Sequence, residues 1–320
     1  HFLLRRQRQM CIRDSLQIAQ PISLSHHLMA YYEMFKRDLN RFENSDNNLS
    51  VLPLGSGALA GNRFKLDRKR MAKNLGFKEV TQNSIDAVSD RDFIAEMMFN
   101  ISLASIHLSR ISEEFIIWSS SQFNYLELPE ELCTGSSIMP QKRNPDMAEL
   151  VRGGAAKTIG NLVSLLSLLK NQPLAYNRDN QEDKAPLFAS IDYVLSAIDI
   201  TSAMVAGAKF NIDEMLNDVF DGHICATDFA EYLVLKGLPF REAHAITGKA
   251  VQLAEKKDAL LAELSLTELK KLSKKIEKDV YKYLDPMTSI SAKTSVGGTA
   301  PSQVKNCLLY TSDAADEGGS

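Results

Sequence analysis

Residues 134–146, TGSSIMPQKRNPD, gather the residue types that bind an anion. A glycine and two serines form the first turn, Lys142 and Arg143 place two cations within reach of the hydroxyls, and prolines bracket the loop. Asn144 is expected to cap a helix whose first residue is Pro145. Hydroxyls, cations and a helix N-terminus together suit carboxylates or phosphates. A solvated connector between helices has the same composition, so the residues alone leave both interpretations open.

A second glycine-rich segment, GSGALAG at 55–61, invites comparison with a dinucleotide-binding loop. Its glycines miss the GxGxxG spacing by one residue and no strand is expected before it, so a turn between helices is the better interpretation. His107 has no carboxylate or thiol partner at a diagnostic spacing, and the four cysteines form no CxxC pair. We therefore expect no metal, no cofactor and a reducing, cytoplasmic location.

The composition is that of an ordinary soluble globular protein of 320 residues, with 44% hydrophobic residues, 24% charged residues and a net charge of -3. This balance offers no basic field for nucleic acid. The most apolar long stretch, 186–210, contains Asp192 and Asp199, which fall on one helix face. That pattern favours a bundle helix over a membrane span, so neither nucleic acid nor membrane is an expected partner.

Helical periodicity dominates the chain and must position the loop. Within 91–118, apolar residues recur at alternating steps of three and four, as in left-handed helix packing. They are Ile94, Met97, Ile101, Ala104, Leu108, Ile111, Phe115 and Trp118. The same alternation predicts a second bundle helix from Leu28, Tyr32, Phe35, Leu39 and Phe42. No stretch shows sustained period-two alternation, so we expect no sheet and an all-α fold with a long helix bundle.

Residues 145–170 and 186–210 are apolar on nearly every face and predict central helices enclosed by neighbours. One chain supplies too few long helices to cover them, which favours an oligomer with a shared bundle. Beyond residue 211 the predicted helices shorten and Lys and Glu become denser. We expect an incomplete bundle domain at 16–210, a small helical domain at 211–306, and foreign-looking tails at 1–15 and 307–320.

The loop at 134–146 resembles the signature GSSxMPxKxNP of the fumarase/aspartase superfamily, whose enzymes eliminate fumarate from a substituted succinate. With Gln141 before Lys142, the loop resembles the version found in the argininosuccinate lyase family. Further segments resemble that family: AQPISLSHHLMAYYEM at 19–34, PLGSGALAGNRF at 53–64, NSIDAVSDRDF at 83–93, PLAYNRDNQEDK at 173–184 and GGTAP at 297–301. The resemblance implies a homotetrameric carbon–nitrogen lyase that cleaves argininosuccinate to L-arginine and fumarate in arginine biosynthesis.

The resemblance also implies roles for particular residues. Ser136 would be the base, acting as an alkoxide stabilised by Lys142 and backbone N–H groups. Glu149 would orient a histidine from another subunit. The implied substrate-binding residues are Ser137, Asn144, Tyr176, Gln181, Lys184 and Arg91. From composition alone Tyr176, Gln181 and Lys184 are ordinary surface residues. Arg91 would look the same in sequence as a buried salt-bridge partner of Asp90 or Asp92.

One departure from the family's pattern bears on activity. The family's Thr-His pair should precede Leu16 directly, and this chain has Asp14-Ser15 there. The family's upstream Ser-Arg-Asn-Asp segment is absent as well. We therefore expect impaired catalysis and impaired tetramer formation for this chain. The alternatives are another fumarate-releasing lyase, such as one acting on adenylosuccinate, or a crystallin-like helical scaffold without activity.

Overall fold

The computed structural model describes residues 9–220 and 222–308. Within these residues the chain forms two compact units. The bundle unit runs from Tyr31 to Lys209, and the small unit consists of the described residues up to Ala30 and from Phe210 onward. The predicted boundaries at 16, 211 and 307 concern independently folding domains and stay predictions. The predicted tails fall largely on residues 1–8 and 309–320, which lie outside the described residues.

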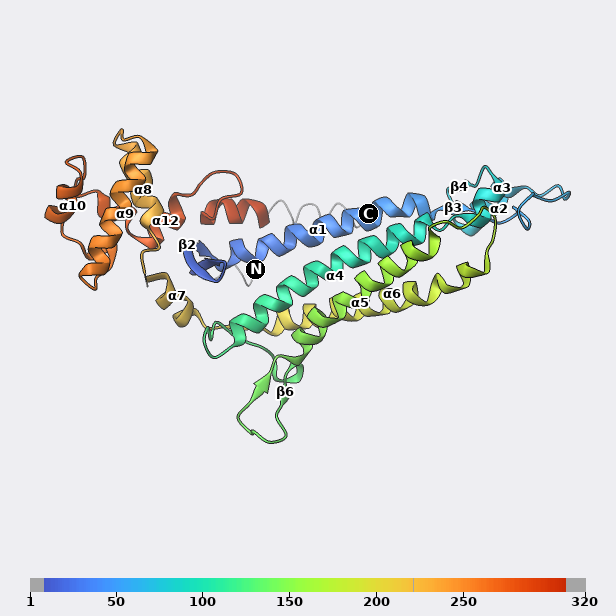
Figure 1. Ribbon diagram of the computed structural model, residues 1–320, viewed down its shortest axis with the longest axis horizontal. Helices are drawn as coiled ribbons and strands as arrows, with labels where there is room; N and C mark the ends of the chain where they lie inside the picture. Colours follow the sequence, from blue (N-terminus) through green and yellow to red (C-terminus); the bar gives the residue numbers. More distant parts are fainter. Residues whose placement is uncertain (1–8, 221, 309–320) are drawn as a thin grey trace. The chain divides into compact units, whose positions relative to one another are not determined.

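Long helices build the bundle unit. Its elements are α1 (Leu24–Leu49, from Tyr31 on), β3 (Val51–Leu52), α2 (Arg68–Leu75), β4 (Glu79–Val80), α3 (Ser84–Ser89), α4 (Asp92–Ser119), β5 (Leu126–Glu127), η1 (Glu130–Leu132), β6 (Thr134–Gly135), β7 (Arg143–Asn144), α5 (Asp146–Leu169), η2 (Arg178–Glu182) and α6 (Lys184–Gly207), and β8 (Lys209–Phe210) lies at its boundary. Figure 1 shows α4, α5 and α6 side by side, and all three pairs are in contact. The all-α bundle expected from the sequence is therefore confirmed.

The helix predicted over 91–118 is confirmed as α4, and its apolar periodicity is the reason for its burial. Every residue of the predicted seam is buried except Met97, which is half-buried. Ile101, Ala104 and Leu108 of α4 pack with Val151 of α5 and Val194 of α6 in one apolar cluster. This cluster fixes α5, the helix that follows the loop at 134–146, against its neighbours.

The apolar seam predicted for α1 is wrong in part. Leu39 is 58% exposed, whereas Asp38 and Ser45 are buried and face α4. Asp38 Oδ2 lies 2.6 Å from Nδ1 of His107, and the Asn100 side chain donates to Ser45 Oγ at 2.7 Å. These polar partners satisfy one another, so α1 can bury polar residues where periodicity favoured apolar ones.

The glycine-rich segment at 55–61 forms a turn, as expected. Gly57 has φ +66°, and a Cβ there would lie 2.5 Å from the carbonyl oxygen of Gly61, so glycine is required. The expectation that no strand precedes the turn is wrong, because β3 does and pairs in parallel with β4. That ladder has two residues on each side, and the next helix begins only at Arg68.

The small unit contains β1 (Gln9–Asp14), β2 (Gln17–Ser23), α7 (Ile212–Phe220), α8 (Ala226–Leu235), α9 (Phe240–Lys256), η3 (Leu261–Glu263), α10 (Leu266–Leu272), α11 (Val280–Tyr283) and α12 (Pro286–Ala292). Its apolar core includes Phe229, Tyr232 and Leu233 of α8 and Ala250 of α9. The helical character expected for 211–306 is confirmed.

The expectation of no sheet is corrected by short two-stranded ladders. The longest pairs β1 with β2 antiparallel, and Ser15 and Leu16 at its turn both have positive φ. Residues 9–14, set aside as a tail, thus take part in a hairpin. The ladder is too short and irregular to produce a sustained period-two pattern, since its register shifts between Ile12 and Arg13.

The stretch Arg178–Gly207, which is η2 together with α6, is long and apolar enough to cross a membrane by length and composition alone. Helices at the centre of a bundle share those two properties. In this structure α6 contacts α4 and α5.

Candidate active site

The loop at 134–146 is the tip of a hairpin that enters α5. Thr134 pairs with Asn144 and Gly135 with Arg143 in the β6–β7 ladder. The N–H of Ser136 donates to the carbonyl of Lys142 at 3.3 Å, and the N–H of Lys142 donates to Met139 at 3.0 Å. Figure 1 shows the hairpin at the end of the bundle where α5 begins. The serine–lysine segment is therefore held in a closed, hydrogen-bonded turn.

Ser136 Oγ accepts two backbone hydrogen bonds inside this turn. The N–H of Met139 lies 3.0 Å from it and the N–H of Ile138 lies 3.3 Å from it. Two N–H groups directed at one hydroxyl oxygen stabilise that oxygen when it loses its proton. The side chain is half-buried, so a ligand can approach it. This geometry suits a serine that serves as a base.

Lys142 and Ser137 are exposed on the same turn, and Asn144 is half-buried in β7. The prediction that Asn144 caps α5 is wrong. The helix begins at Asp146, the cap position is Pro145, and no side-chain hydrogen bond caps it in the described part of the chain. The reason is the pairing of Asn144 with Thr134, which keeps its backbone in the ladder. Asp146 instead accepts a hydrogen bond from the Thr134 hydroxyl, which ties the hairpin to the helix.

Glu149 lies in the first turn of α5 and is exposed. It lines an open groove of about 350 Å³ between α5 and α6, together with Gly154, Lys157 and Tyr193. The nearby cation Arg152 pairs with Glu113 at 2.5 Å, and this hydrogen bond raises the pKa of Arg152. Among the described residues Glu149 has no ion-pair partner, so its carboxylate can accept a hydrogen bond from outside the chain.

Tyr193 closes the inner side of this groove. Burial raises the pKa of Tyr193 to about 12, so its hydroxyl stays protonated at neutral pH. The hydroxyl donates to the carbonyl of Val151 at 2.5 Å. The tyrosine therefore fixes the first turns of α5 against α6 and has a positional role at the groove.

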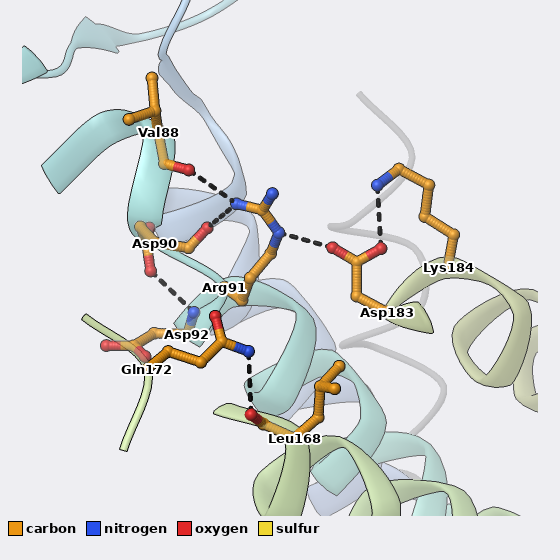
Figure 2. Close-up of polar contacts among 8 residues, drawn as sticks. All are labelled: Val88, Asp90, Arg91, Asp92, Leu168, Gln172, Asp183 and Lys184. Atoms are coloured by element: carbon orange, nitrogen blue, oxygen red, sulfur yellow. Dashed lines mark hydrogen bonds and ion pairs between the residues drawn. The ribbon is translucent and has the colours of Figure 1, made fainter. Parts of the chain in front are cut away.

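Arg91 and Lys184 meet at a third residue that the sequence analysis did not select. Asp183 Oδ2 accepts from Arg91 Nε at 2.5 Å, and Asp183 Oδ1 lies 2.8 Å from Lys184 Nζ (Figure 2). Asp183 is buried, whereas the Lys184 side chain is 60% exposed. We call Arg91, Asp183 and Lys184 the arginine–lysine cluster. The salt-bridge partner of Arg91 is thus Asp183, 92 residues away, rather than Asp90 or Asp92.

Tyr176 and Gln181 are exposed in the segment that leads to this cluster. The segment is anchored where the N–H of Ala175 donates to Ser89 Oγ at 2.6 Å, which ties it to α3. Asn180 lies in η2 and is buried, and in the described chain its side-chain amide has no hydrogen-bond partner. The structure therefore gathers Arg91, Tyr176, Gln181 and Lys184 at one end of the bundle.

The predicted site residues fall into two groups at opposite ends of α5. Ser136, Ser137, Lys142, Asn144 and Glu149 lie at its beginning, and Arg91, Tyr176, Gln181 and Lys184 lie beyond its end. The 24 residues of α5, at a rise of about 1.5 Å each, separate these groups by roughly 36 Å. A single chain does not bring them together, so one chain cannot form a site that uses both groups.

Two family models match the chain. One is described as Lyase and matches residues 10–160, and the other is described as Argininosuccinate lyase C-terminal and matches residues 223–291. The first covers the hairpin at 134–146 and the start of α5, and the second falls within the small unit. The two matches therefore include both parts of the described chain.

Individual relatives agree with these matches. Argininosuccinate lyase of Ruthia magnifica subsp. Calyptogena magnifica is 49% identical over 293 residues, which are 92% of this chain and 61% of the relative. Argininosuccinate lyase of Desulfatibacillum aliphaticivorans is 51% identical over 285 residues, which are 89% of this chain and 61% of the relative. The chain thus spans about three fifths of the length of these relatives.

A solved structure extends the comparison to three dimensions. The crystal structure of EDDS lyase in complex with formate has a TM-score of 0.88 and 29% identity, and the match covers 98% of this chain and 63% of that chain. Fumarate lyase from Mesorhizobium sp. BNC1 shares the fold, with a TM-score of 0.79 and 19% identity, over 96% of this chain and 69% of that chain.

The long-helix bundle and the family match over residues 10–160 place the chain in the fumarase/aspartase superfamily. Within that superfamily, the chain belongs to the argininosuccinate lyase family.

Proposed function

We propose that this chain carries the catalytic loop of an enzyme that eliminates fumarate from argininosuccinate and releases L-arginine, a step of arginine biosynthesis. The observation that carries the proposal is the pair of backbone N–H groups directed at Ser136 Oγ. They support an alkoxide at this position, and the exposed ammonium of Lys142 lies on the same turn. A serine base needs such support because its hydroxyl is otherwise too weak an acid.

The reaction follows from these groups. Ser136 removes the proton from the carbon beside a substrate carboxylate, and the electrons collect on that carboxylate as a dianion. Lys142, Ser137 and Asn144 hold the dianion through charge and hydrogen bonds. Collapse of the dianion breaks the bond to the guanidinium nitrogen, which a general acid protonates, and fumarate leaves. Glu149 would accept a hydrogen bond from the histidine that supplies this proton, as the family resemblance implies.

The substrate's distal end would be bound by the other group, Tyr176, Gln181, Lys184 and Arg91. Because about 36 Å of helix separates the two groups within one chain, we propose that each site combines chains of a homotetramer. The large exposed apolar residues of α5 and α6 support this, since a contiguous apolar surface marks an interface. They are Leu150, Ile159, Val163, Leu166, Phe188, Leu195, Ile198 and Val205. We place the protein in the cytoplasm and expect neither nucleic acid nor membrane as a partner.

The experiment follows fumarate by its ultraviolet absorbance after addition of argininosuccinate, adenylosuccinate or EDDS. We expect release from argininosuccinate alone, and loss of release in Ser136→Ala. Ser167→Ala is the matched control, because Ser167 is an exposed serine whose hydroxyl donates to the Val163 carbonyl of the same helix. Release from adenylosuccinate in preference to argininosuccinate would reject the proposed substrate.

The chain alone is expected to release fumarate slowly, because it has Asp14-Ser15 in place of the family's Thr-His pair. Loss of one general acid–base partner lowers reaction rates by about 10²–10⁴. We therefore also propose to co-fold this chain with a variant of the Desulfatibacillum aliphaticivorans relative. In that variant the serine that corresponds to Ser136 is replaced by alanine. Mixed oligomers should release fumarate faster than either protein alone, and the Ser136→Ala chain should abolish that gain. Light scattering of the co-folded mixture tests the assembly, and mixed complexes of fewer than four chains would contradict the tetramer. A clean tetramer of the purified chain alone would contradict its expected impaired assembly.

A further inference from the structure

Asp183 is the buried centre of the arginine–lysine cluster, and the proposed function uses only its two cationic neighbours. Its side chain has no solvent exposure, and each carboxylate oxygen has one cationic partner. Removing a carboxylate from water is unfavourable unless such partners compensate for it. The two cations are therefore the reason that this carboxylate can be buried, and the carboxylate in turn limits where they can lie.

Arg91 is held on two sides. Its Nε donates to Asp183, and its Nη1 donates to the carbonyls of Asp90 at 2.6 Å and Val88 at 3.4 Å. Figure 2 shows Asp183 on the Nε side of the guanidinium and the two carbonyls at Nη1. Within the described residues Nη2 has no hydrogen-bond partner, so its two N–H groups stay available. The side chain is 13% exposed, which leaves a narrow opening to solvent.

Lys184 supplies a second available donor group. Its ammonium uses one contact, to Asp183 Oδ1, and its side chain is mostly exposed. The cluster contains two cations and one carboxylate, so it carries one net positive charge. A guanidinium edge beside an ammonium suits the two oxygens of a carboxylate, which accept hydrogen bonds from both.

Asp183 also joins separate segments. Arg91 directly precedes α4, and Asp183 directly precedes α6. The segment that carries Tyr176 is tied to α3 through Ala175 and Ser89. Without the carboxylate, the Arg91 guanidinium and the Lys184 ammonium would repel each other, and nothing else among their hydrogen bonds in the described chain would keep them adjacent.

We propose that Asp183 is a positioning residue, which holds Arg91 and Lys184 as a pair that binds a carboxylate of the substrate. This inference rests on the proposed function, because it takes argininosuccinate as the ligand. Asp183 itself does not touch the ligand, since it has no exposed surface.

The test measures argininosuccinate binding by titration calorimetry for the purified chain, at a temperature where circular dichroism shows every variant folded. Asp183→Asn should weaken binding by about 10- to 100-fold, the effect of one charge-assisted hydrogen bond. Asp183→Glu should recover part of the affinity. Asp179→Asn, the same change at an exposed acid of η2, should bind like the wild type.

A purely structural role would lower the melting temperature without changing the affinity of the folded protein. Wild-type affinity in Asp183→Asn would therefore overturn the inference, as would a folded Asp183→Glu that binds no better than Asp183→Asn. If the wild-type chain binds argininosuccinate but its mixed oligomers with the relative release no fumarate, the proposed catalysis fails and the positioning role still stands.

If the wild-type chain binds no argininosuccinate, the ligand assignment fails, and the Nε–H resonance of Arg91 in ¹⁵N NMR tests the holding role separately. A slowly exchanging Arg91 resonance that is lost in Asp183→Asn and kept in Asp179→Asn supports the role of Asp183. An Arg91 resonance that is the same in Asp183→Asn as in the wild type overturns it.

Discussion

Gly154 allows α5 and α6 to approach each other at the groove that Glu149 lines. A Cβ at this position would lie 2.1 Å from Cε2 of Tyr193 and 2.8 Å from its Cζ. Carbon atoms in contact are separated by about 3.5–4.0 Å, so in Gly154→Ala the ring must move by roughly 1.5 Å. That movement breaks the hydrogen bond from the Tyr193 hydroxyl to Val151.

These effects can be added. Overpacking costs about 1–3 kcal/mol and loss of the hydrogen bond about 1 kcal/mol, whereas alanine gains about 1 kcal/mol over glycine inside a helix. We expect Gly154→Ala to lower the free energy of unfolding by about 1–3 kcal/mol. The adjacent Gly153 is the matched control, because its added Cβ meets nothing within 4 Å. Gly153→Ala should therefore raise the free energy of unfolding by about 0.5–1 kcal/mol.

The assay is urea unfolding followed by the fluorescence of Trp118, the only tryptophan, which is buried in α4 of the bundle unit. The two alanine variants should differ by about 2–4 kcal/mol, although they sit on neighbouring residues of one helix. In a Tyr193→Ala background the Gly154→Ala penalty should largely disappear, since the clashing atoms are gone. A Gly154→Ala chain as stable as Gly153→Ala would refute the close approach of the two helices.

Two further outcomes are expected. Asp38→Ala should lower the free energy of unfolding by about 3 kcal/mol, because it removes the buried partner of the largely enclosed His107 side chain. Asp46→Ala removes an exposed pair with Lys78 and should leave the urea midpoint nearly unchanged. Equal losses in the two variants would contradict the stabilising role of the Asp38–His107 pair. A hydrogen bond from Lys257, followed by those from Ser265, lowers the pKa of Glu268 from 4.5 to about 2. Between pH 2 and pH 4.5 the folded state therefore binds fewer protons than the unfolded state. Its stabilising contribution is therefore complete above about pH 4.5 and is lost as the pH falls toward 2, and Glu268→Gln should flatten that part of the stability profile measured by circular dichroism.

Periodicity and the signature loop were sufficient to predict α4 and the position of the candidate base. The burial of Ile101, Leu108 and Phe115 was predictable, because apolar residues at helical spacing are stable only when their face of the helix packs against a neighbour. Ser136 was predicted as the base from the resemblance of its loop to the superfamily signature, and its hydrogen-bonding partners lie within three residues of it in the same loop. Local information of this kind is contained in the sequence.

Other features depended on pairings across the chain. Asp183 belongs to a highly charged segment, which predicts an exposed position. One of the two cations that compensate for its burial is Arg91, which lies 92 residues earlier in the sequence. The pair of Asp38 and His107 spans 69 residues and has no local signal. Asn144 favoured a helix cap by its residue type, but pairing with Thr134 determined its backbone conformation. The separation of the two groups of site residues likewise follows from the length of α5 and not from their spacing in sequence.

The polar contacts between α1 and α4 restrict how these two helices can align. Asp38 with His107 and Ser45 with Asn100 repeat at a spacing of seven residues on both helices, in antiparallel order. A shift of one helix along the other by a single turn, about 5.4 Å, would break both contacts between the helices and separate His107 from Asp38 and the buried Asn100 from Ser45. Apolar side chains at these positions would allow several alignments of α1 along α4, whereas the polar pairs allow only one alignment. Evolutionary change at any one of the four positions is therefore expected to require a compensating change at its partner, so the two pairs should vary together among homologues.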